Sequence, residues 1–436
     1  MSSKTKTTAA KKDAKSALVP KLRFPEFREA GEWTTETLGA VAKISTKKVG
    51  AKACVPMSIT SGVGLVSQME KFGRIIAGSS YANYLQLKKN DFAYNKSATK
   101  EYPEGFIALY TGDKLAAVPN SIFTCFRVTG DSPIPQYLNY LFLGNLHGRW
   151  LRNFIEVGAR AHGSLSINQD DLLALPIPLP AEKSSVREQQ KIAECLSSVD
   201  ELLAAQARKV DALKTHKKGL MQQLFPREGE TQPRLRFSKA GDWVVKGLPE
   251  VAFFQEGPGI MAVDFRSKGV PLVRLSGVSG SVVTLDGCNY LDPAKVELKW
   301  PHFRLAVNDL LISTSATFGL SSIVTEAAAG AVFYTGLIRF RPSSDLLDRG
   351  YLKIYLGCPH FERQAQAAAV GGGIKHFGPT HLKQMEIPIP PLAEQQRIAE
   401  CLSSLDALIT AETQKLEALK THKKGLMQQL FPSPEE

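Results

Sequence analysis

The sequence predicts an α+β fold in which two pseudo-symmetric mixed α/β domains are joined by two long helices that form an antiparallel coiled coil. Three observations predict this class. A helical stretch occurs twice in the 436 residues, at 188–226 and at 394–432. Short β-rich runs separated by Gly, Pro and Asn precede each copy, and each β-rich part opens on a similar segment, at 22–39 and at 235–249. Because internal repeats fix the architecture of a chain, we interpret the protein as two related halves.

The repeated stretch has the pattern of a coiled-coil helix. The first copy reads EQQKIAECLSSVDELLAAQARKVDALKTHKKGLMQQLFP, and the second is identical to it at 29 of the 39 positions, including all of 419–432. Apolar residues recur in alternating steps of four and three, the period that keeps one stripe facing a partner helix. The predicted seam consists of Ile192, Leu196, Val199, Leu203, Val210, Leu213, Leu220 and Leu224 in the first copy, and Ile398, Leu402, Leu405, Ile409, Leu416, Leu419, Leu426 and Leu430 in the second.

Four polar residues occupy the remaining seam positions: Gln206 and Lys217 in the first copy, Glu412 and Lys423 in the second. Polar seam residues usually fix the register of a coiled coil at a cost in stability. The alternative is that they are solvated positions of an imperfect seam. Both copies close on Phe-Pro, since proline cannot continue a helix.

The repeats divide the chain into seven segments. The first is a basic, disordered arm with few bulky apolar residues, and the last is a short tail. In chain order they are the arm (1–20), the first globular domain (21–180), the first helix (181–226), a linker (227–242), the second globular domain (243–390), the second helix (391–432) and the tail (433–436).

Composition limits the functional class. The net charge is +12 and the pI is about 9.3, which favours a polyanionic partner such as nucleic acid. No apolar run is long enough to cross a membrane, and the N-terminus lacks the apolar core of a secretory signal. The six cysteines form neither a CxxC pair nor a Cys/His cluster, so we expect reduced thiols, no metal site and a cytoplasmic protein.

Catalytic motifs are absent from the sequence. It contains no phosphate-binding glycine loop before a helix and no nucleophile elbow. The residues Asp292, Glu297 and Lys299 resemble a nuclease centre, but their spacing is short and the first half has no counterpart. The glycine run 371–373 is interpreted as a flexible connection, with a phosphate-contacting loop as the alternative. We therefore expect no catalytic residues.

Binding is the function that these patterns favour. In each half, basic and amide side chains lie among aromatic residues, and such groups contact phosphates or base edges. The predicted DNA-binding residues are Tyr94, Asn95, Lys96, Lys100, Arg160 and His162 in the first half, and Arg266, Lys268, Arg274, Thr314, Lys375 and His376 in the second. For each of them, an ordinary surface or core role is the alternative.

Taken together, the repeats resemble the specificity subunit of a Type I restriction-modification system. The resemblance rests on the Leu-Arg-Phe…Trp segments, on an Asn-Asp pair in each half (at 90–91 and 308–309), and on an Ile-Pro-x-Pro run that leads into each Glu-Gln-Gln helix. It covers nearly the whole chain after the arm. The chain departs from a strict repeat where seven residues, AEKSSVR, precede Glu188 but only three, PLA, precede Glu394.

The resemblance implies two target recognition domains, each reading one half of a split double-stranded DNA site in a bacterial or archaeal cytoplasm. It also implies that this chain has no catalysis and no cofactor of its own. The partners would be two methylation subunits, which use S-adenosylmethionine, and two restriction subunits, which use ATP and Mg²⁺.

The length of the helix predicts a spacing for such a site. An antiparallel pair places the globular halves at opposite ends, as in dimeric repressors on split operators, whereas a parallel pair would place them together. A 39-residue helix is about 58 Å long, which corresponds to roughly 17 base pairs of DNA. We therefore expect the helices to set a fixed gap between two short half-sites.

Two other function classes predict different behaviour. A coiled-coil adaptor that binds proteins would bind DNA without a preferred sequence and only at low salt. A nuclease or methyltransferase acting alone would turn over substrate as an isolated chain, and the missing motifs argue against that class.

Overall fold

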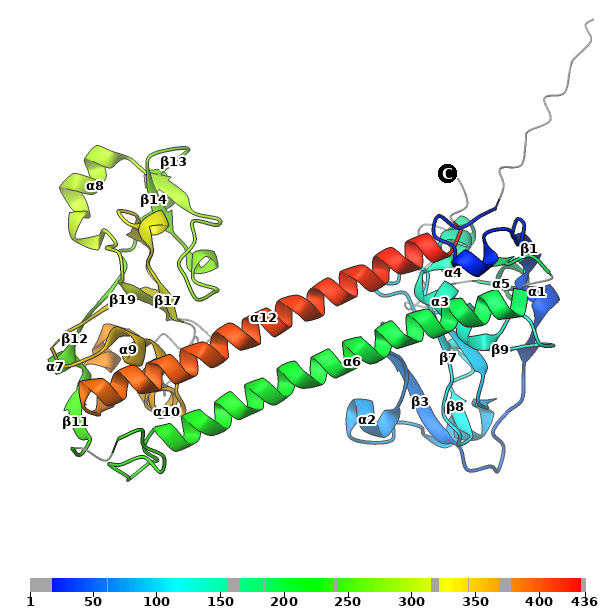
Figure 1. Cartoon of the computed structure of the whole chain (residues 1–436), viewed down its shortest axis with the longest axis horizontal. Coiled ribbons are helices and arrows are strands. Elements are labelled where there is room, and N and C mark those ends of the chain that lie inside the picture. The colour runs from blue at the N-terminus through cyan, green and yellow to red at the C-terminus, as the bar shows by residue number, and fades with distance from the viewer. Residues whose placement is uncertain are drawn as a thin grey trace, which may run out of the picture. The chain divides into compact units, whose positions relative to one another are not determined.

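The computed structural model describes most of the chain, and it divides into two compact units. Unit 1 comprises residues 1–205 and 415–436, and unit 2 comprises 206–414. The ranges described are 18–60, 62–155, 165, 167–182, 185–238, 241–314, 321–343, 345–368 (for 368, the backbone alone) and 378–432. Figure 1 labels the elements of both units, which are described separately here.

Unit 1 begins with the first globular domain, built on two four-stranded sheets and one two-stranded sheet in its described part. The strands are β1 (Thr34–Thr37), β2 (Ala42–Ser45), β3 (Val55–Thr60), β4 (Gly64–Ser67), β5 (Leu85–Leu87), β6 (Asp91–Asn95), β7 (Phe106–Leu109), β8 (Ala116–Val118), β9 (Phe123–Val128) and β10 (Pro176–Leu179). The helices are α1 (Leu38–Val41), α2 (Gln68–Phe72), α3 (Pro135–Leu143), α4 (Leu146–Leu151) and α5 (Gln169–Leu173), with short 3₁₀ turns at Pro25–Phe27, Ser79–Asn83 and Arg152–Phe154.

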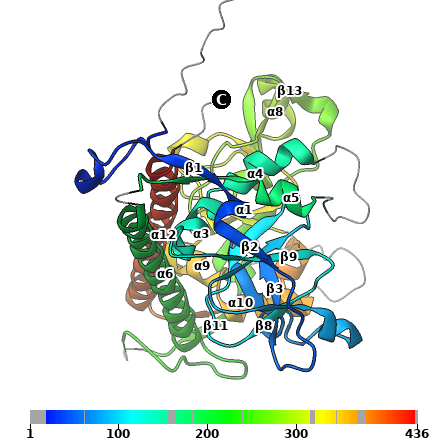
Figure 2. The same cartoon turned by 90° about the vertical axis from the view of Figure 1, so that its right-hand side faces the viewer.

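One sheet of this domain, in the order β2-β9-β6-β7, is antiparallel throughout. The other, β4-β3-β8-β5, contains the parallel pair β3–β8. All five residues of β6 are buried, since both faces of this strand are covered. Helix α3 packs against β7, and its Tyr140 hydroxyl donates to Asp200 of the first long helix at 2.9 Å. Helix α3 therefore lies between the sheet and the helices, as Figure 2 also shows.

Unit 2 contains the second globular domain. Its described strands are β11 (Val244–Gly247), β12 (Ala252–Glu256), β13 (Phe265–Arg266), β14 (Val270–Val273), β15 (Asn289–Leu291), β16 (Leu310–Ser313), β17 (Ser321–Ile323), β18 (Val332–Phe333), β19 (Leu337–Pro342) and β20 (Glu386–Ile389). Its helices are α7 (Leu248–Val251), α8 (Pro293–Lys299), α9 (Arg349–Tyr355), α10 (Pro359–Ala368) and α11 (Pro379–Leu382), with 3₁₀ turns at Ala262–Asp264, Leu275–Gly277, Pro301–Phe303 and Glu326–Ala328.

The second domain repeats the plan of the first. Its antiparallel sheet has the order β12-β19-β16-β17, and its other sheet, β13-β15-β14-β18, contains the parallel pair β14–β18. The Ile-Pro-x-Pro strands β10 and β20 pair with β1 and β11, the strands that follow the two tryptophans. The Tyr137 hydroxyl donates to the Pro178 carbonyl at 2.6 Å, and the Tyr351 hydroxyl donates to the Pro388 carbonyl at the same distance.

The two long helices are α6 (Ser185–Leu224) and α12 (Leu392–Leu430), shown in green and red in Figure 1. The beginning of α6 and the end of α12 belong to unit 1, while the end of α6 and the beginning of α12 belong to unit 2. The helices therefore run antiparallel. All sixteen predicted apolar seam residues are buried or half-buried, whereas Leu202 and Leu408, off the seam, are exposed.

Each helix end completes the core of a globular domain. In unit 1, Phe431 packs edge-on against Tyr137, with ring centroids 5.5 Å apart. In unit 2, Phe225 packs against Tyr351 at 5.7 Å. The structure thus confirms the predicted α+β class and the antiparallel helices. Among the described helices, none has the length and apolar content to span a membrane.

Candidate nucleic-acid interface

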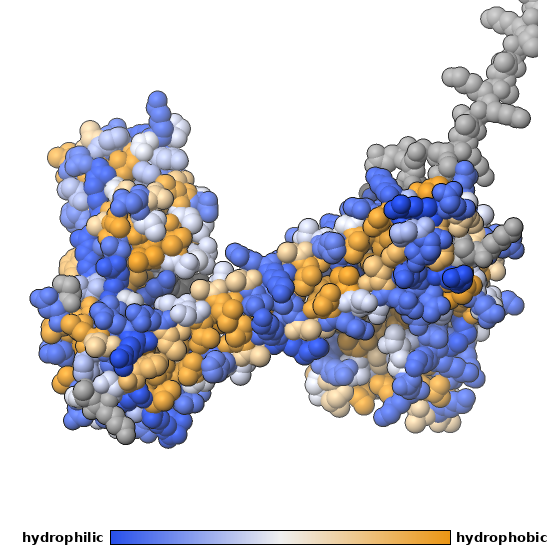
Figure 3. Space-filling model, viewed as in Figure 1, coloured by the Kyte–Doolittle hydropathy of each residue, from blue (hydrophilic) through white to orange (hydrophobic). Residues whose placement is uncertain are grey.

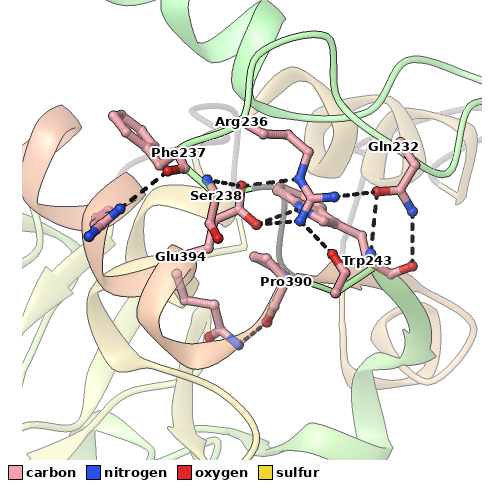
Figure 4. Close-up of polar contacts among 10 residues, drawn as sticks. Gln232, Arg236, Phe237, Ser238, Trp243, Pro390 and Glu394 are labelled. Atoms are coloured by element: carbon pink, nitrogen blue, oxygen red, sulfur yellow. Dashed lines mark hydrogen bonds and ion pairs between the residues drawn. The ribbon is translucent and has the colours of Figure 1, made fainter.

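Each domain is fastened to its helix by the glutamate of the Glu-Gln-Gln motif. In unit 2, the buried Glu394 carboxylate accepts from Nε and Nη2 of Arg236 and from Nε1 of Trp243, at 3.3, 2.7 and 3.2 Å (Figure 4). The Arg236 Nη2 also donates to the Gly241 carbonyl. Its hydrogen bond to Glu394 raises the pKa of Arg236. The motif residue therefore joins the first turns of α12 to the Leu-Arg-Phe…Trp segment.

Unit 1 repeats this joint. Arg23 binds Glu188 through two hydrogen bonds of 2.8 Å, and its Nη1 donates to the Gly31 carbonyl at 2.6 Å. The arrangement differs at the tryptophan, because the buried Nε1 of Trp33 has no hydrogen-bond partner among the described residues.

The glutamine that follows each glutamate holds a second element. Gln189 Oε1 accepts from the backbone N–H of Ile134, the residue before α3, at 2.8 Å. Gln395 Oε1 accepts from the N–H of Asp348, the residue before α9, at 2.7 Å. Both glutamines are fully buried. The shared motif thus orients equivalent helices in both domains.

The Asn-Asp pairs form equivalent turns before β6 and β16. Asn90 and Asn308 adopt positive φ of 70° and 77°, a conformation that asparagine tolerates better than most residues. Asp91 accepts from the N–H of Lys88 and pairs with Arg127, while Asp309 accepts from the N–H of Ala306 and pairs with Arg341. The two aspartates therefore build the scaffold through protein partners.

Polar contacts between α6 and α12 are reciprocal. Lys423 Nζ donates to Asp200 in unit 1, and Lys217 Nζ donates to Asp406 in unit 2, at 2.5 and 2.6 Å. In unit 2, Gln206 Nε2 donates to the carboxylate of Glu412 at 2.6 Å and to its backbone carbonyl at 2.9 Å. All four polar seam residues thus have partners on the facing helix.

The predicted DNA-binding residues of the first half fall into different environments. Tyr94 is fully buried, and its hydroxyl donates to the Glu104 carbonyl at 2.8 Å. Asn95 is buried and accepts from the N–H of Ser97. This burial argues against a base contact by Tyr94, whose ring has no surface to offer, and burial also raises its pKa. Lys96 is half-buried and Lys100 is exposed.

In the second half, Arg266 and Lys268 are exposed and Arg274 is half-buried, all at the sheet β13-β15-β14-β18. Thr314 directly follows β16 and is buried, which argues against a DNA contact by its side chain. The remaining predicted residues, Arg160, His162, Lys375 and His376, lie outside the described residues, as does the glycine run 371–373. The structure therefore places Arg266, Lys268 and Arg274 on or beside the strands of one small sheet.

Sequence reasoning missed the residues that fix Arg274. Its guanidinium lies over the Tyr334 ring at 4.0 Å and the Phe265 ring at 5.6 Å, and its Nη1 donates to Asn289 Oδ1 at 3.0 Å. Tyr334 lies far from Arg274 in the chain, and Phe265 and Asn289 come from the strands β13 and β15, so no local pattern indicates these three partners.

The acidic group in α8 has a structural role. Asp292 Oδ1 accepts from the N–H groups of Ala294 and Lys295 and so caps the helix, and Glu297 pairs with Arg304. No group of three or more metal-ligating side chains occurs within the described ranges.

Comparisons with known proteins agree with this architecture. Residues 241–421 match the sequence model of the Type I restriction modification DNA specificity domain. One relative carries the name of the type I restriction enzyme MjaX specificity subunit and comes from Methanocaldococcus jannaschii. It is 27% identical over 335 residues, which cover 75% of this chain and 74% of the relative. The MjaVIII specificity subunit from the same organism is 25% identical over 289 residues, 64% of this chain and 66% of the relative.

Solved structures share the fold. A chain from a structure of complex assembly and conformational transition in a type I restriction-modification system aligns with a TM-score of 0.59 and 19% identity, covering 92% of this chain and 98% of that one. The S subunit from M. genitalium aligns with a TM-score of 0.53 and 14% identity, covering 95% and 100%. In its repeated joints, its paired helices and its matched specificity domain, the chain is similar to Type I restriction-modification specificity subunits.

Proposed function

We propose that this chain is the non-catalytic subunit that gives a Type I restriction-modification complex its target, and that it reads two half-sites separated by a fixed gap. The observation that carries the proposal is the repetition of one frame. Both domains have an antiparallel sheet with the same strand order and the same Glu–Arg joint, and each packs on both long helices. Two similar readers joined by one helix pair are suited to two short sequences a set distance apart.

The net charge of +12 supports DNA as the ligand, because lysine and arginine side chains supply the phosphate contacts of DNA-binding proteins. The second domain contributes basic residues suited to DNA contacts, with Arg266, Lys268 and Arg274 at one small sheet. Hydrophilic and hydrophobic side chains are mixed over the visible face of this unit (Figure 3). Catalysis is assigned to partner subunits, two for methylation with S-adenosylmethionine and two for restriction with ATP and Mg²⁺.

The outward faces of α6 and α12 are the proposed seats of the two methylation subunits. Leu202 and Leu408 occupy equivalent positions in the repeat and are 58% and 41% exposed, although neither belongs to the seam. Changing either leucine to aspartate should reduce co-purification of the methylation subunit. The matched control is Leu298→Asp, since Leu298 lies on α8 and is 80% exposed. Unchanged co-purification in both helix variants would remove this assignment.

Mapping of methylated adenines tests the main proposal. The chain is expressed with its methylation subunit in a host that lacks both, and a host with the methylation subunit alone is the control. We expect a two-part motif with a constant gap that appears only when this chain is present. An unchanged methylation pattern, with both proteins present as a complex, would favour a protein-binding adaptor instead.

A further inference from the structure

We propose that Arg274 is a preorganised base reader of the second recognition domain, and that it recognises the major-groove edge of a guanine in one half-site. The inference rests on the proposed DNA-reading function and adds a residue and a base to it. Its basis is the environment that holds this side chain on the sheet β13-β15-β14-β18.

The guanidinium of Arg274 is held in place by neutral groups. It lies 4.0 Å from the ring centroid of Tyr334 and 5.6 Å from that of Phe265, and the two rings are tilted by 69° to each other. Its Nη1 donates to Asn289 Oδ1 at 3.0 Å. These contacts restrict the plane of the guanidinium, so little rotamer entropy remains to be lost on binding a ligand.

Six other arginines differ from Arg274 because each is paired with a carboxylate. In the described ranges, those paired with carboxylates within 3 Å are Arg23, Arg127, Arg152, Arg236, Arg304 and Arg341. Arg274 has no carboxylate partner among the described residues, and Asn289 is the one acceptor there that its N–H groups reach. Its positive charge and its remaining donors therefore stay available for a ligand.

The geometry of the group favours a base edge over a phosphate. A planar guanidinium fork matches the N7 and O6 acceptors of guanine through two hydrogen bonds, the commonest specific contact in DNA recognition. A phosphate can accept the same fork, but phosphate contacts position a protein and carry no sequence information, so the two ligands differ in whether the target motif changes with Arg274. The neighbouring Arg266 is the phosphate-type counterpart, since it is exposed and its Nη1 reaches only the main-chain carbonyls of Val263 and Phe265.

Methylation mapping of complexes that contain full-length variants tests the inference. Arg274→Ala should reduce the preference for one G·C pair in one half-site by roughly ten- to a hundred-fold, and leave the other half-site and the gap unchanged. Arg274→Lys should relax the same position, because an ammonium group keeps the charge without the fork. The matched control Arg266→Ala should lower methylation evenly at all sites without changing the motif.

Tyr334 serves as a positioning residue, and its variants separate orientation from charge. Tyr334→Phe keeps the ring and should retain the motif, whereas Tyr334→Ala should relax the G·C position that Arg274→Ala relaxes. If Arg274→Ala yields no folded complex, Arg274→Lys and Tyr334→Ala decide the question.

Two outcomes would overturn the assignment. One is a folded Arg274 variant whose motif is unchanged at every position. The other is an even loss of methylation with the motif intact, which would make Arg274 a phosphate contact. Failure of the proposed function has a different result, since the unaltered chain would then direct methylation to no two-part motif at all.

Discussion

His147 is a histidine held neutral in the core of unit 1. It is fully buried beside Phe142, its Nε2 lies 3.2 Å from the Gly105 carbonyl, and its Nδ1 has no partner among the described residues. Burial lowers its pKa to about 4, below the value near 6.5 of an unfolded chain. As the pH falls, the His147 imidazole is therefore protonated in the unfolded state before it is protonated in the folded state.

Acid should consequently destabilise unit 1 through this residue. The contribution of neutral His147 to the free energy of unfolding is complete above pH 6.5. It is lost as the pH falls toward about 4, and the total loss is on the order of 3 kcal/mol. Urea unfolding between pH 7 and pH 4.5 measures it, with His147→Gln as the comparison. The variant should lose part of the pH dependence in this window, and an identical dependence in both proteins would contradict the prediction. His216, on an exposed face of α6, provides the control substitution His216→Gln.

Glu394 allows a second test at the scale of one residue. Its carboxylate is fully buried and binds both Arg236 and Trp243, so Glu394→Ala leaves a largely buried guanidinium without its charge partner. We expect a loss of about 3 kcal/mol in the free energy of unfolding of unit 2. Urea unfolding followed by tryptophan fluorescence measures the loss, since Trp243 lies in the joint. Glu400→Ala, an exposed position on the same helix, should change stability by less than about 0.5 kcal/mol.

The limits of sequence reasoning are clearest at single residues. The repeat marks Glu188, Glu394, Arg23 and Arg236 as shared positions, but the letters do not show that they bind one another. The position of Tyr94 beside Asn95 and Lys96 predicts a DNA contact for its side chain. In the structure its hydroxyl is satisfied by the Glu104 carbonyl inside the core. Whether a tyrosine hydroxyl faces solvent or a distant carbonyl depends on tertiary packing, which a local pattern does not contain.

At the scale of elements, the helix pair has an asymmetric centre. Gln206 and Glu412 are equivalent positions of the repeat, so they face each other at its local twofold centre, where an amide donates to a carboxylate at 2.6 Å. Gln206→Glu would place two carboxylates together and should lower the free energy of unfolding by about 1 to 2 kcal/mol. Adding Glu412→Gln exchanges the two groups and should restore most of the loss. A double-mutant cycle by urea unfolding measures the coupling, and additive effects would mean that the pair does not interact.

The helices were predictable and the sheets were not, for a physical reason. The apolar residues of a coiled-coil seam recur every 3.5 residues within one helix. The seam residues from Ile192 to Leu224 can therefore be predicted from local sequence. Strand pairing joins residues far apart in the chain. The parallel pairs β3–β8 and β14–β18, and the set of rings around Arg274, depend on such contacts. The sequence therefore indicates that two β-rich domains exist and leaves their register open.

At the scale of the whole molecule, the helices are the proposed ruler of the target. Inserting one heptad at equivalent points, after Arg208 and after Gln414, would lengthen each helix by about 10 Å, or roughly three base pairs. We expect methylation mapping to show a longer gap between two unchanged half-sites. Insertion into one helix alone should instead disturb the seam and abolish methylation. A change in the half-sites themselves would contradict the role of the helices as a ruler.

The closing segments 213–226 and 419–432 are identical, yet each completes a different domain. Phe225 packs on Tyr351 and Phe431 packs on Tyr137. Both domains therefore pack against the same closing segment, although their strands and loops have little sequence in common. A recombination event that replaces one globular domain would therefore leave the helix residues that pack against it unchanged. Under the proposed function, the identical closing segments would let one recognition domain be replaced by another type without any change in the helices.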